Sequence, residues 1–190
     1  MTVDTLPAMQ FTDITAIRVL FSPEQGQETH DELLVRLQDA LAKRARVVAS
    51  NYSIDDADIL SVLTEIGKAA PASLFLFDSS EFFGEKEKPL VEALIAALGD
   101  QNPGAQWAIG TSPVDGNILH NKVIVAIYPD GHAWTFTGSY NVTASASKEA
   151  NNAWFIDSAQ CAAAFAAEIE KDFAWCRANQ PQPPTEKPSY

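Results

Sequence analysis

The sequence predicts an α/β protein, an α+β mixed-sheet sandwich with helices packed on a β-sheet. Over the first 110 residues, short apolar and β-branched runs alternate with amphipathic helical patterns, and this alternation is typical of strand–helix units. From Ile118 onward the pattern changes to extended runs around a hairpin signal, followed by an Ala-rich helical segment. We therefore expect the order β-α-β-α-β-α-β, then a β-hairpin, a further strand and a C-terminal helix.

The first two units lie in residues 14–66. A strand is expected at 14–21, because this apolar run ends at a Ser-Pro pair. Residues 31–45 space their leucines at helical intervals, which predicts an amphipathic helix. A buried strand follows at 47–52, and Ile59 to Ile66 continue with a second helical pattern.

The third unit has a strand at 73–77, a polar loop and a helix at 89–98, and a fourth short strand is expected at 106–110. Three strand–helix units in succession predict a parallel or mostly parallel sheet with helices on its faces. This part of the chain supplies the scaffold.

The second part of the chain is expected to form a hairpin. Extended runs at 123–128 and 133–137 flank Asp130-Gly131, which is a strong hairpin signal. A further strand is expected at 153–156 and a closing helix at 161–175.

Length and composition predict one domain, residues 1–178, with a Pro-rich flexible tail at 179–190. A hydrophobic content of 46% excludes a wholly disordered chain. The two cysteines, Cys161 and Cys176, form neither a disulfide framework nor a zinc pattern.

The charge pattern limits the possible partners. A net charge of −12 argues against a generally basic surface that coats nucleic acid or an anionic membrane. Residues 101–156 are closer to neutral, with Lys122 and Lys148 against three acids. The first eleven residues contain no basic residue, and no apolar run is long enough to span a membrane. We expect a cytoplasmic protein with no transmembrane segment.

The residues with catalytic chemistry lie around the predicted hairpin. His120 and Lys122 are two positions apart at the start of a strand, so their side chains project from one face. If Asp130 and Gly131 are the two central turn residues, His120 lies opposite Asn141 and Lys122 lies opposite Ser139.

This set of four side chains suits attack on a phosphodiester. A histidine can be the nucleophile or the proton donor, while Lys122 and Asn141 stabilise charge on the phosphate oxygens. The side chains supply the positive charge, so we expect neither a metal ion nor another cofactor. The acids Asp55, Asp56 and Asp58 are better explained as helix N-terminal residues than as a metal cluster.

These residues resemble a known signature. His120-Asn-Lys122, followed by Gly-Ser139-Tyr-Asn141 and Thr143, is similar to the HxK…GSxxN pattern of the phospholipase D superfamily. It is most similar to the small bacterial endonucleases that carry one copy of the motif. The resemblance covers residues 14–175 and implies the phospholipase D/nuclease-like fold.

The resemblance also implies roles for the residues. His120 matches the catalytic histidine that forms a phosphohistidine intermediate, and Lys122 matches the phosphate-binding lysine. Ser139 and Asn141 match the polar residues of the second element. Active sites in that family use two such motifs, and neither His30 nor His132 is followed by a lysine two residues later. The resemblance therefore implies a homodimer that pairs two copies of His120.

The sequence differs from the family pattern at two acidic positions. The motif aspartate falls on Ile127, and the nearest acid is Asp130. The later glutamate falls near Asn151 and Asn152, with Glu149 slightly early. We therefore treat Asp130, Glu149, Asn151 and Asn152 as possible supporting groups. Three functions stay open: a nuclease, a hydrolase of phospholipids or other small phosphodiesters, and a non-catalytic nucleic-acid-binding or interaction module.

Overall fold

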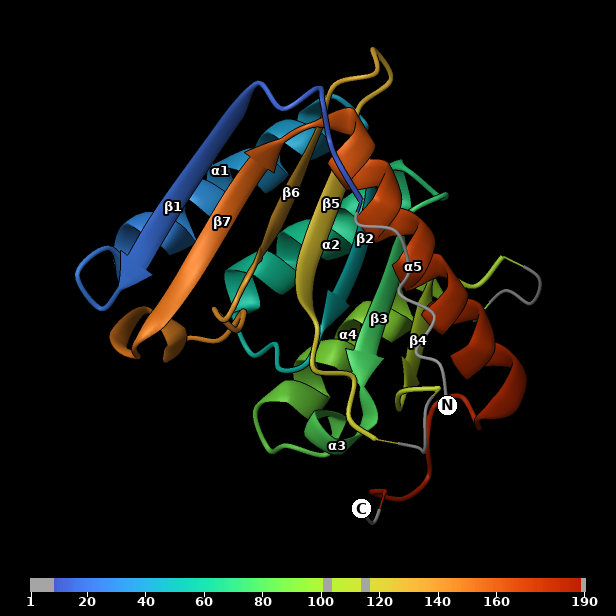
Figure 1. Ribbon diagram of the computed structural model, residues 1–190. Helices are drawn as coiled ribbons and strands as arrows, with labels where there is room; N and C mark the ends of the chain where they lie inside the picture. The colour runs from blue at the N-terminus through green and yellow to red at the C-terminus, as the bar shows by residue number, and fades with distance from the viewer. Residues whose placement is uncertain (1–8, 101–103, 114–116, 189–190) are drawn as a thin grey trace, which may run out of the picture.

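The computed structural model describes residues 9–100, 104–113 and 117–188. Its described part contains a seven-stranded sheet in the order β1-β7-β6-β5-β2-β3-β4 (Figure 1). The strands are β1 (Ala16–Ser22), β2 (Arg46–Asn51), β3 (Leu74–Asp78), β4 (Trp107–Gly110), β5 (Lys122–Ile127), β6 (Ala133–Gly138) and β7 (Asn151–Asp157). The helices are α1 (Gly26–Ala42), α2 (Ala57–Ala69), α3 (Ser79–Phe82), α4 (Glu87–Leu98), the 3₁₀ turn η1 (Ala146–Lys148) and α5 (Ala159–Asn179).

The helices form two unequal layers on the sheet. Helices α1, α2 and α4 cover one face, and of the described helices only α5 packs on the other (Figure 1). Alternate strand positions supply the two cores: Val47 and Ala49 join the larger core under α1, α2 and α4, while Val48 joins the smaller core under α5. The strand period of two therefore explains how β2 is buried on both faces.

The strand directions differ from the expected mostly parallel sheet. Only the β2–β3 and β3–β4 pairings are parallel, whereas every other pairing in the described sheet is antiparallel. The first strand, β1, is an outer strand of the sheet and pairs with β7. Tight connections such as the β5–β6 hairpin produce antiparallel neighbours, and sequence order alone does not reveal that β1 pairs with the last strand.

The observed register of β5 and β6 differs from the predicted one by one residue, because the hairpin turn is longer. Ile127 pairs with Ala133, and the Tyr128 N–H donates to the His132 carbonyl oxygen at 2.8 Å. The loop therefore contains three residues, Pro129 to Gly131, and Gly131 has φ +88°. Proline favours the first central position of a turn, and a glycine with positive φ completes a three-residue loop. The assumed two-residue turn is wrong.

The polar residues of interest lie along the side of the sheet where several strands end. Strands β2, β3, β4 and β6 end at this edge, and β5 and β7 begin there, at the lower side of Figure 1. We call it the carboxyl edge. The β5–β6 turn lies at the opposite edge. Among the described residues, no helix has the length and apolar character needed to cross a bilayer.

The C-terminal segment contacts the sheet where the sequence predicts a flexible tail. Helix α5 continues to Asn179, and the side chains of Gln180 and Gln182 then bond to the outer strand β4. Gln182 accepts from the Ile109 N–H at 2.9 Å and donates to the Ile109 carbonyl oxygen at 2.7 Å. Gln180 accepts from the Thr111 N–H at 3.0 Å.

Several element boundaries also differ from the expected ones. Helix α1 begins at Gly26 rather than at residue 31, and the short helix α3 occupies part of the predicted polar loop. Asp78 starts α3 by accepting a hydrogen bond from the Ser80 N–H at 2.7 Å. A helix of only four residues gives no periodic pattern that a sequence could reveal.

Candidate active site

His120 and Lys122 lie at the carboxyl edge, where the chain enters β5. The His120 side chain is exposed, whereas Lys122 is only 6% exposed. The Lys122 ammonium donates to the His120 carbonyl oxygen at 3.2 Å and forms no ion pair with any described acidic residue. Burial lowers the Lys122 pKa. A buried ammonium without a counter-ion is a strong anion-binding group.

Tyr52 contacts both members of this pair. It follows β2 directly, and its ring centroid lies 4.6 Å from that of His120. The Lys122 nitrogen lies over the same ring, 4.9 Å from the centroid. The Tyr52 hydroxyl donates to Glu81 Oε1 at 3.1 Å. One aromatic side chain thus supports the histidine and the lysine from β2.

Asp78 supports the pair from β3. Its side chain is fully buried, and its Oδ2 accepts from the Leu119 N–H at 2.6 Å. Leu119 immediately precedes His120. Burial lowers the His120 pKa, the Lys122 charge lowers it further, and Asp78 opposes both. The imidazole is therefore mainly neutral near pH 7, the form that a nucleophile requires.

Asn51 adds a buried side-chain amide to the site. It pairs with Lys122 across the β2–β5 ladder and is 1% exposed. Neither polar atom of its side chain has a hydrogen-bond partner within the described part of the chain. An unpartnered buried amide costs on the order of 1–3 kcal/mol, so its position beside Lys122 needs a functional explanation.

The second predicted element forms a corner after β6. Gly138 has φ +136°, and a Cβ there would collide with the Asn152 carbonyl oxygen. Ser139 Oγ accepts from the Asn152 N–H at 2.9 Å. Asn141 Oδ1 is buried without a hydrogen-bond partner among the described residues. A short bridge between Ile54 and Val142 holds this corner beside the segment that follows Tyr52.

The structure brings the four predicted catalytic residues to one edge, although not in the predicted pairs. Because Ile124 pairs with Phe136, continuing the ladder places Lys122 against Gly138 rather than against Ser139. His120 and Asn141 then lie beyond the ends of the two strands. All four residues therefore lie at the carboxyl edge, at or beyond the ends of β5 and β6.

The four possible supporting residues separate into different places. Asp130 lies in the turn at the opposite edge, and its Oδ1 accepts from the His132 N–H at 2.9 Å. Glu149 is exposed and accepts from the Ser145 hydroxyl at 2.8 Å. Asn151 donates to the Ala146 carbonyl oxygen at 3.3 Å. Asn152 contacts the predicted site through Ser139.

Tyr52, Asp78 and Asn51 are site residues that the sequence reasoning missed. Each lies at the end of a predicted strand or directly after it. Polar residues at the carboxyl ends of parallel strands are a recognised binding signal, so this signal could have identified them. Their position near His120 and Lys122 could not be read from the sequence, because β5 enters the sheet beside β2 in a way that the sequence does not specify.

A buried acid lies near this site. Glu87 is 3% exposed, and its Oε2 accepts from the Ile54 N–H at 3.1 Å. Burial raises its pKa to about 8, and the charges of Glu81 and Asp78 add to this effect. Glu87 lines an acidic cavity of about 350 Å³ together with Glu81 and Ser53. The surroundings of Tyr52 are therefore acidic on one side.

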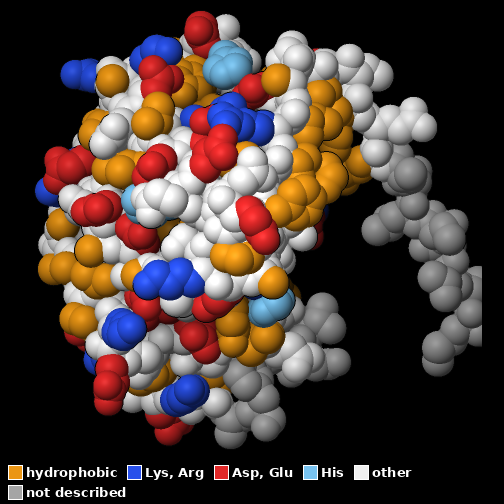
Figure 2. All heavy atoms as spheres, turned by 90° about the vertical axis from the view of Figure 1, so that its left-hand side faces the viewer, with side chains coloured by type: hydrophobic (Ala, Val, Ile, Leu, Met, Phe, Trp, Pro, Cys, Tyr) orange, Lys and Arg blue, Asp and Glu red, His pale blue; other side chains and the backbone are white. Residues whose placement is uncertain are grey.

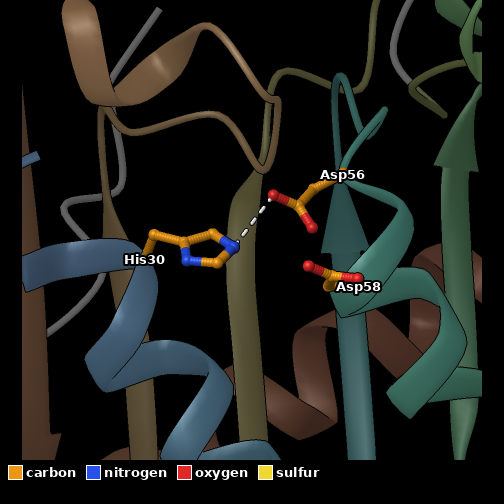
Figure 3. Close-up of side chains that lie close together, drawn as sticks. All are labelled: His30, Asp56 and Asp58. Carbon is orange, nitrogen blue, oxygen red and sulfur yellow. Dashed lines mark ion pairs between the residues drawn. The ribbon is translucent and has the colours of Figure 1, made fainter. Parts of the chain in front are cut away.

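A separate group of side chains could hold a metal ion. The ligand atoms of His30, Asp56 and Asp58 lie within 4.8 Å of one another, and the three side chains converge in Figure 3. His30 Nε2 lies 3.1 Å from Asp56 Oδ2. Asp56 also caps α2 by accepting from the Ile59 N–H at 3.0 Å, as expected for an acid at a helix N-terminus. The contact with His30 and the helix cap account for the position of Asp56.

Comparison with known proteins finds similar folds rather than similar sequences. No protein-family model matches the chain, and no curated protein sequence matches it. Among solved structures, it is similar to Nuc from Salmonella typhimurium, a phospholipase D family member, with a TM-score of 0.63 and 20% identity. That match covers 84% of this chain and 94% of Nuc.

Two further structures have the same arrangement. NucT from Helicobacter pylori is 17% identical with a TM-score of 0.59, and the match covers 85% of this chain and 97% of NucT. Polyphosphate kinase from Porphyromonas gingivalis is 13% identical with a TM-score of 0.58. In that case the match covers 88% of this chain and 27% of the kinase. At these identities the comparisons establish the fold.

Proposed function

We propose that this chain, which has the phospholipase D fold, is a metal-independent phosphodiesterase, and specifically a nuclease. The observation that carries the proposal is the pair at the carboxyl edge: an exposed His120 next to a buried Lys122 whose charge no described acid neutralises. Asn51 adds a buried amide whose nitrogen and oxygen both have no hydrogen-bond partner among the described residues. This set matches the needs of a phosphate group.

The reaction would proceed in two steps. Neutral His120 attacks phosphorus, an N–P bond forms, and the P–O bond to the leaving alcohol breaks. A second histidine protonates the departing oxygen and then takes a proton from the water that hydrolyses the phosphohistidine. Lys122 would stabilise the charge that develops on the non-bridging oxygens, and the side-chain N–H of Asn141 would donate a hydrogen bond to them.

The second histidine would come from another copy of the chain in a homodimer, because His30 and His132 lie elsewhere in the fold. Ile17, Phe21 and Trp154 are 50%, 57% and 41% exposed, and they lie on the α5-side face of β1 and β7. Helix α5 packs on β2 to β6 and leaves this strip open. Hydrophobic side chains gather at the right-hand border of Figure 2, the side that faces the viewer in Figure 1. Such a strip suits a protein partner.

A second candidate is a hydrolase of phospholipids or other small phosphodiesters. The acidic cavity beside Tyr52 and the net charge of −12 favour it, because both repel a long polyanion. A nuclease with this surface is expected to bind its substrate weakly and to lose little affinity as salt is added, because few basic side chains contact phosphates.

The test is hydrolysis of DNA, RNA, a phospholipid and a chromogenic phosphodiester in the presence of EDTA. His120→Ala should lower the rate by at least about 1,000-fold, while His132→Ala should retain it. Sedimentation should show a dimer for both variants. Full activity of His120→Ala would refute the mechanism, and lipid cleavage without nucleic-acid cleavage would favour the second candidate. A purely monomeric active enzyme would exclude the shared site.

A further inference from the structure

We propose that Tyr52 and Asp78 are positioning residues, which hold and charge-balance the His120–Lys122 pair from β2 and β3 in place of the two acids that the sequence motif lacks. This inference rests on the proposed function for its catalytic consequence. Its structural part concerns the state of His120 in the free protein and can be measured separately.

Tyr52 acts as a shared support for the two side chains. Its ring lies 4.6 Å from the His120 ring and 4.9 Å from the Lys122 nitrogen, measured from the ring centroid. A lysine over an aromatic face is attracted by the negative face of the ring, and more strongly where the site is desolvated. Because Lys122 is 6% exposed, its contact belongs to the desolvated kind. Movement of this ring would change the position of both groups.

The ring itself is fixed by a hydrogen bond. The Tyr52 hydroxyl donates to Glu81 Oε1 at 3.1 Å, and Glu81 belongs to α3. The start of α3 is in turn set by Asp78, whose Oδ1 accepts from the Ser80 N–H at 2.7 Å. The turn between β3 and α3 thus determines where the Tyr52 ring lies.

Asp78 reaches the pair by a second route. Its Oδ2 accepts from the Leu119 N–H at 2.6 Å, which fixes the backbone one residue before His120. Asp78 is 0% exposed, and its charge acts on His120 in the direction that favours the protonated imidazole. A buried carboxylate with this placement can stabilise the charge that His120 acquires on attack or protonation.

The positions of the motif acids cannot supply this support. Ile127 ends β5 at the opposite edge and carries no charge, and Asp130 lies in the turn beyond it. Asn152 is uncharged, and Glu149 is bonded to Ser145 on the exposed surface. The acids that contact the His120–Lys122 neighbourhood come from the β3–α3 turn.

The chain offers a matched control for Tyr52. Tyr128, near the opposite edge, has a ring centroid 5.2 Å from that of His132 and 5.5 Å from the Lys43 nitrogen. Its hydroxyl donates to Asp39 Oδ2 at 2.8 Å. Removal of either ring therefore deletes the same kinds of contact, but only Tyr52 touches the proposed catalytic pair.

The experiment compares Tyr52→Leu, Tyr52→Phe, Asp78→Asn and Tyr128→Leu in the full chain. Imidazole NMR titration gives the His120 pKa without any substrate. Tyr52→Leu should raise this pKa, because the ring contributes to burial of the imidazole, whereas Asp78→Asn should lower it, because a negative charge is lost. Tyr52→Phe retains the ring and should change the pKa less than Tyr52→Leu does. Tyr128→Leu should leave it unchanged.

The kinetic measurement uses the same variants with the phosphodiester substrate. Tyr52→Leu and Asp78→Asn should each lower kcat by roughly 10- to 100-fold with little change in KM, and the acidic limb of the pH profile should move with the His120 pKa. Asp78→Ser, which retains a helix-capping oxygen without the charge, provides a second variant if Asp78→Asn does not fold.

The outcomes separate the two proposals. Unchanged His120 titration in folded Tyr52→Leu and Asp78→Asn or Asp78→Ser would overturn the positioning role even in an active enzyme. Shifts of the same sign in both residues' variants would also overturn it, because they would indicate a general structural change. The expected opposite shifts in a chain that cleaves no phosphodiester would uphold the positioning role and refute the proposed function.

Discussion

Two ends of the central strands carry nearly the same group of side chains, a tyrosine that contacts a histidine, a lysine and an acid. At the carboxyl edge the tyrosine is Tyr52, with Lys122 at 4.9 Å and a hydrogen bond to Glu81. At the opposite edge it is Tyr128, with Lys43 at 5.5 Å and a hydrogen bond to Asp39. Contact geometry alone does not distinguish a candidate site from an ordinary surface cluster.

The two groups differ in how the lysine charge is neutralised. The Lys43 side chain is 61% exposed, and its nitrogen lies 2.9 Å from Asp39 Oδ1. Lys122 is 6% exposed and forms no ion pair within the described ranges of the chain. Water and Asp39 already satisfy Lys43, whereas Lys122 retains a charge that an anionic ligand can neutralise. Burial without a counter-ion is the property that distinguishes the candidate site from the group around Tyr128.

The largest expected difference between the two ends is in activity. Lys122→Met should lower phosphodiester hydrolysis by roughly 100- to 1,000-fold, because it removes the buried charge that stabilises the transition state. Lys43→Met should change the rate by no more than about twofold, since exposed ion pairs contribute little. Steady-state kinetics at one ionic strength tests both. Equal losses in the two variants would remove the functional distinction between the edges.

The second expected difference is in the pH dependence of stability. Glu87, near the carboxyl edge, has its pKa raised to about 8 from an ordinary value of 4.5. The proton it holds in the folded state therefore stabilises the fold fully below about pH 4.5, and this contribution is lost as the pH rises towards 8. This group should lower the free energy of unfolding of the wild-type chain by about 3 kcal/mol between pH 5 and 8, and Glu87→Gln should abolish that decrease.

Asp39, an acid at the opposite edge, should show the opposite pH dependence of stability. Hydrogen bonds from Lys43 and Tyr128 lower the Asp39 pKa, so its contribution is present above the ordinary value of 3.8 and is lost as the pH falls below it. Asp39→Asn should cost less than about 1 kcal/mol at pH 7, because the side chain is 43% exposed and solvent screens its ion pair. Urea unfolding from pH 3 to 9 measures both variants. A stability of Glu87→Gln that still falls from pH 5 to 8 would contradict the assignment.

The smallest expected difference concerns the two glycine turns. Gly138→Ala should destabilise the fold by about 3 kcal/mol, because it combines a positive φ with a collision against the Asn152 backbone. Gly131→Ala should cost about 1 kcal/mol, because the space around Gly131 is open and only the positive φ is strained. Thermal unfolding measures the pair. A larger loss for Gly131→Ala would reverse the ranking of the two turns.

The sequence predicts the elements better than it predicts their neighbours. Apolar runs and helical spacing identify the long helices and the strands, because these patterns are local. The place of β1 beside β7 depends on contacts between residues 16 and 157, and no local pattern records it. The register error at Pro129 arises because Asp130-Gly131 fits both a two-residue and a three-residue loop.

The candidate site was predictable in part for the same reason. His120, Lys122, Ser139 and Asn141 belong to one continuous segment, so their spacing is visible in the sequence. Tyr52 and Asp78 come from strands that are 68 and 42 residues away from His120, and they reach the site only because β5 lies beside β2. Their roles depend on tertiary pairing, which a single sequence does not specify.

The bonds from Gln180 and Gln182 to β4 have a consequence for association between molecules. An outer strand presents unpaired N–H and C=O groups to which another chain can add a strand, a common route to aggregation. The two glutamine side chains occupy the N–H groups of Ile109 and Thr111 and the carbonyl oxygen of Ile109. The chain therefore blocks one border of its own sheet with side-chain amides in place of a further strand, and uncontrolled growth of the sheet from β4 is disfavoured.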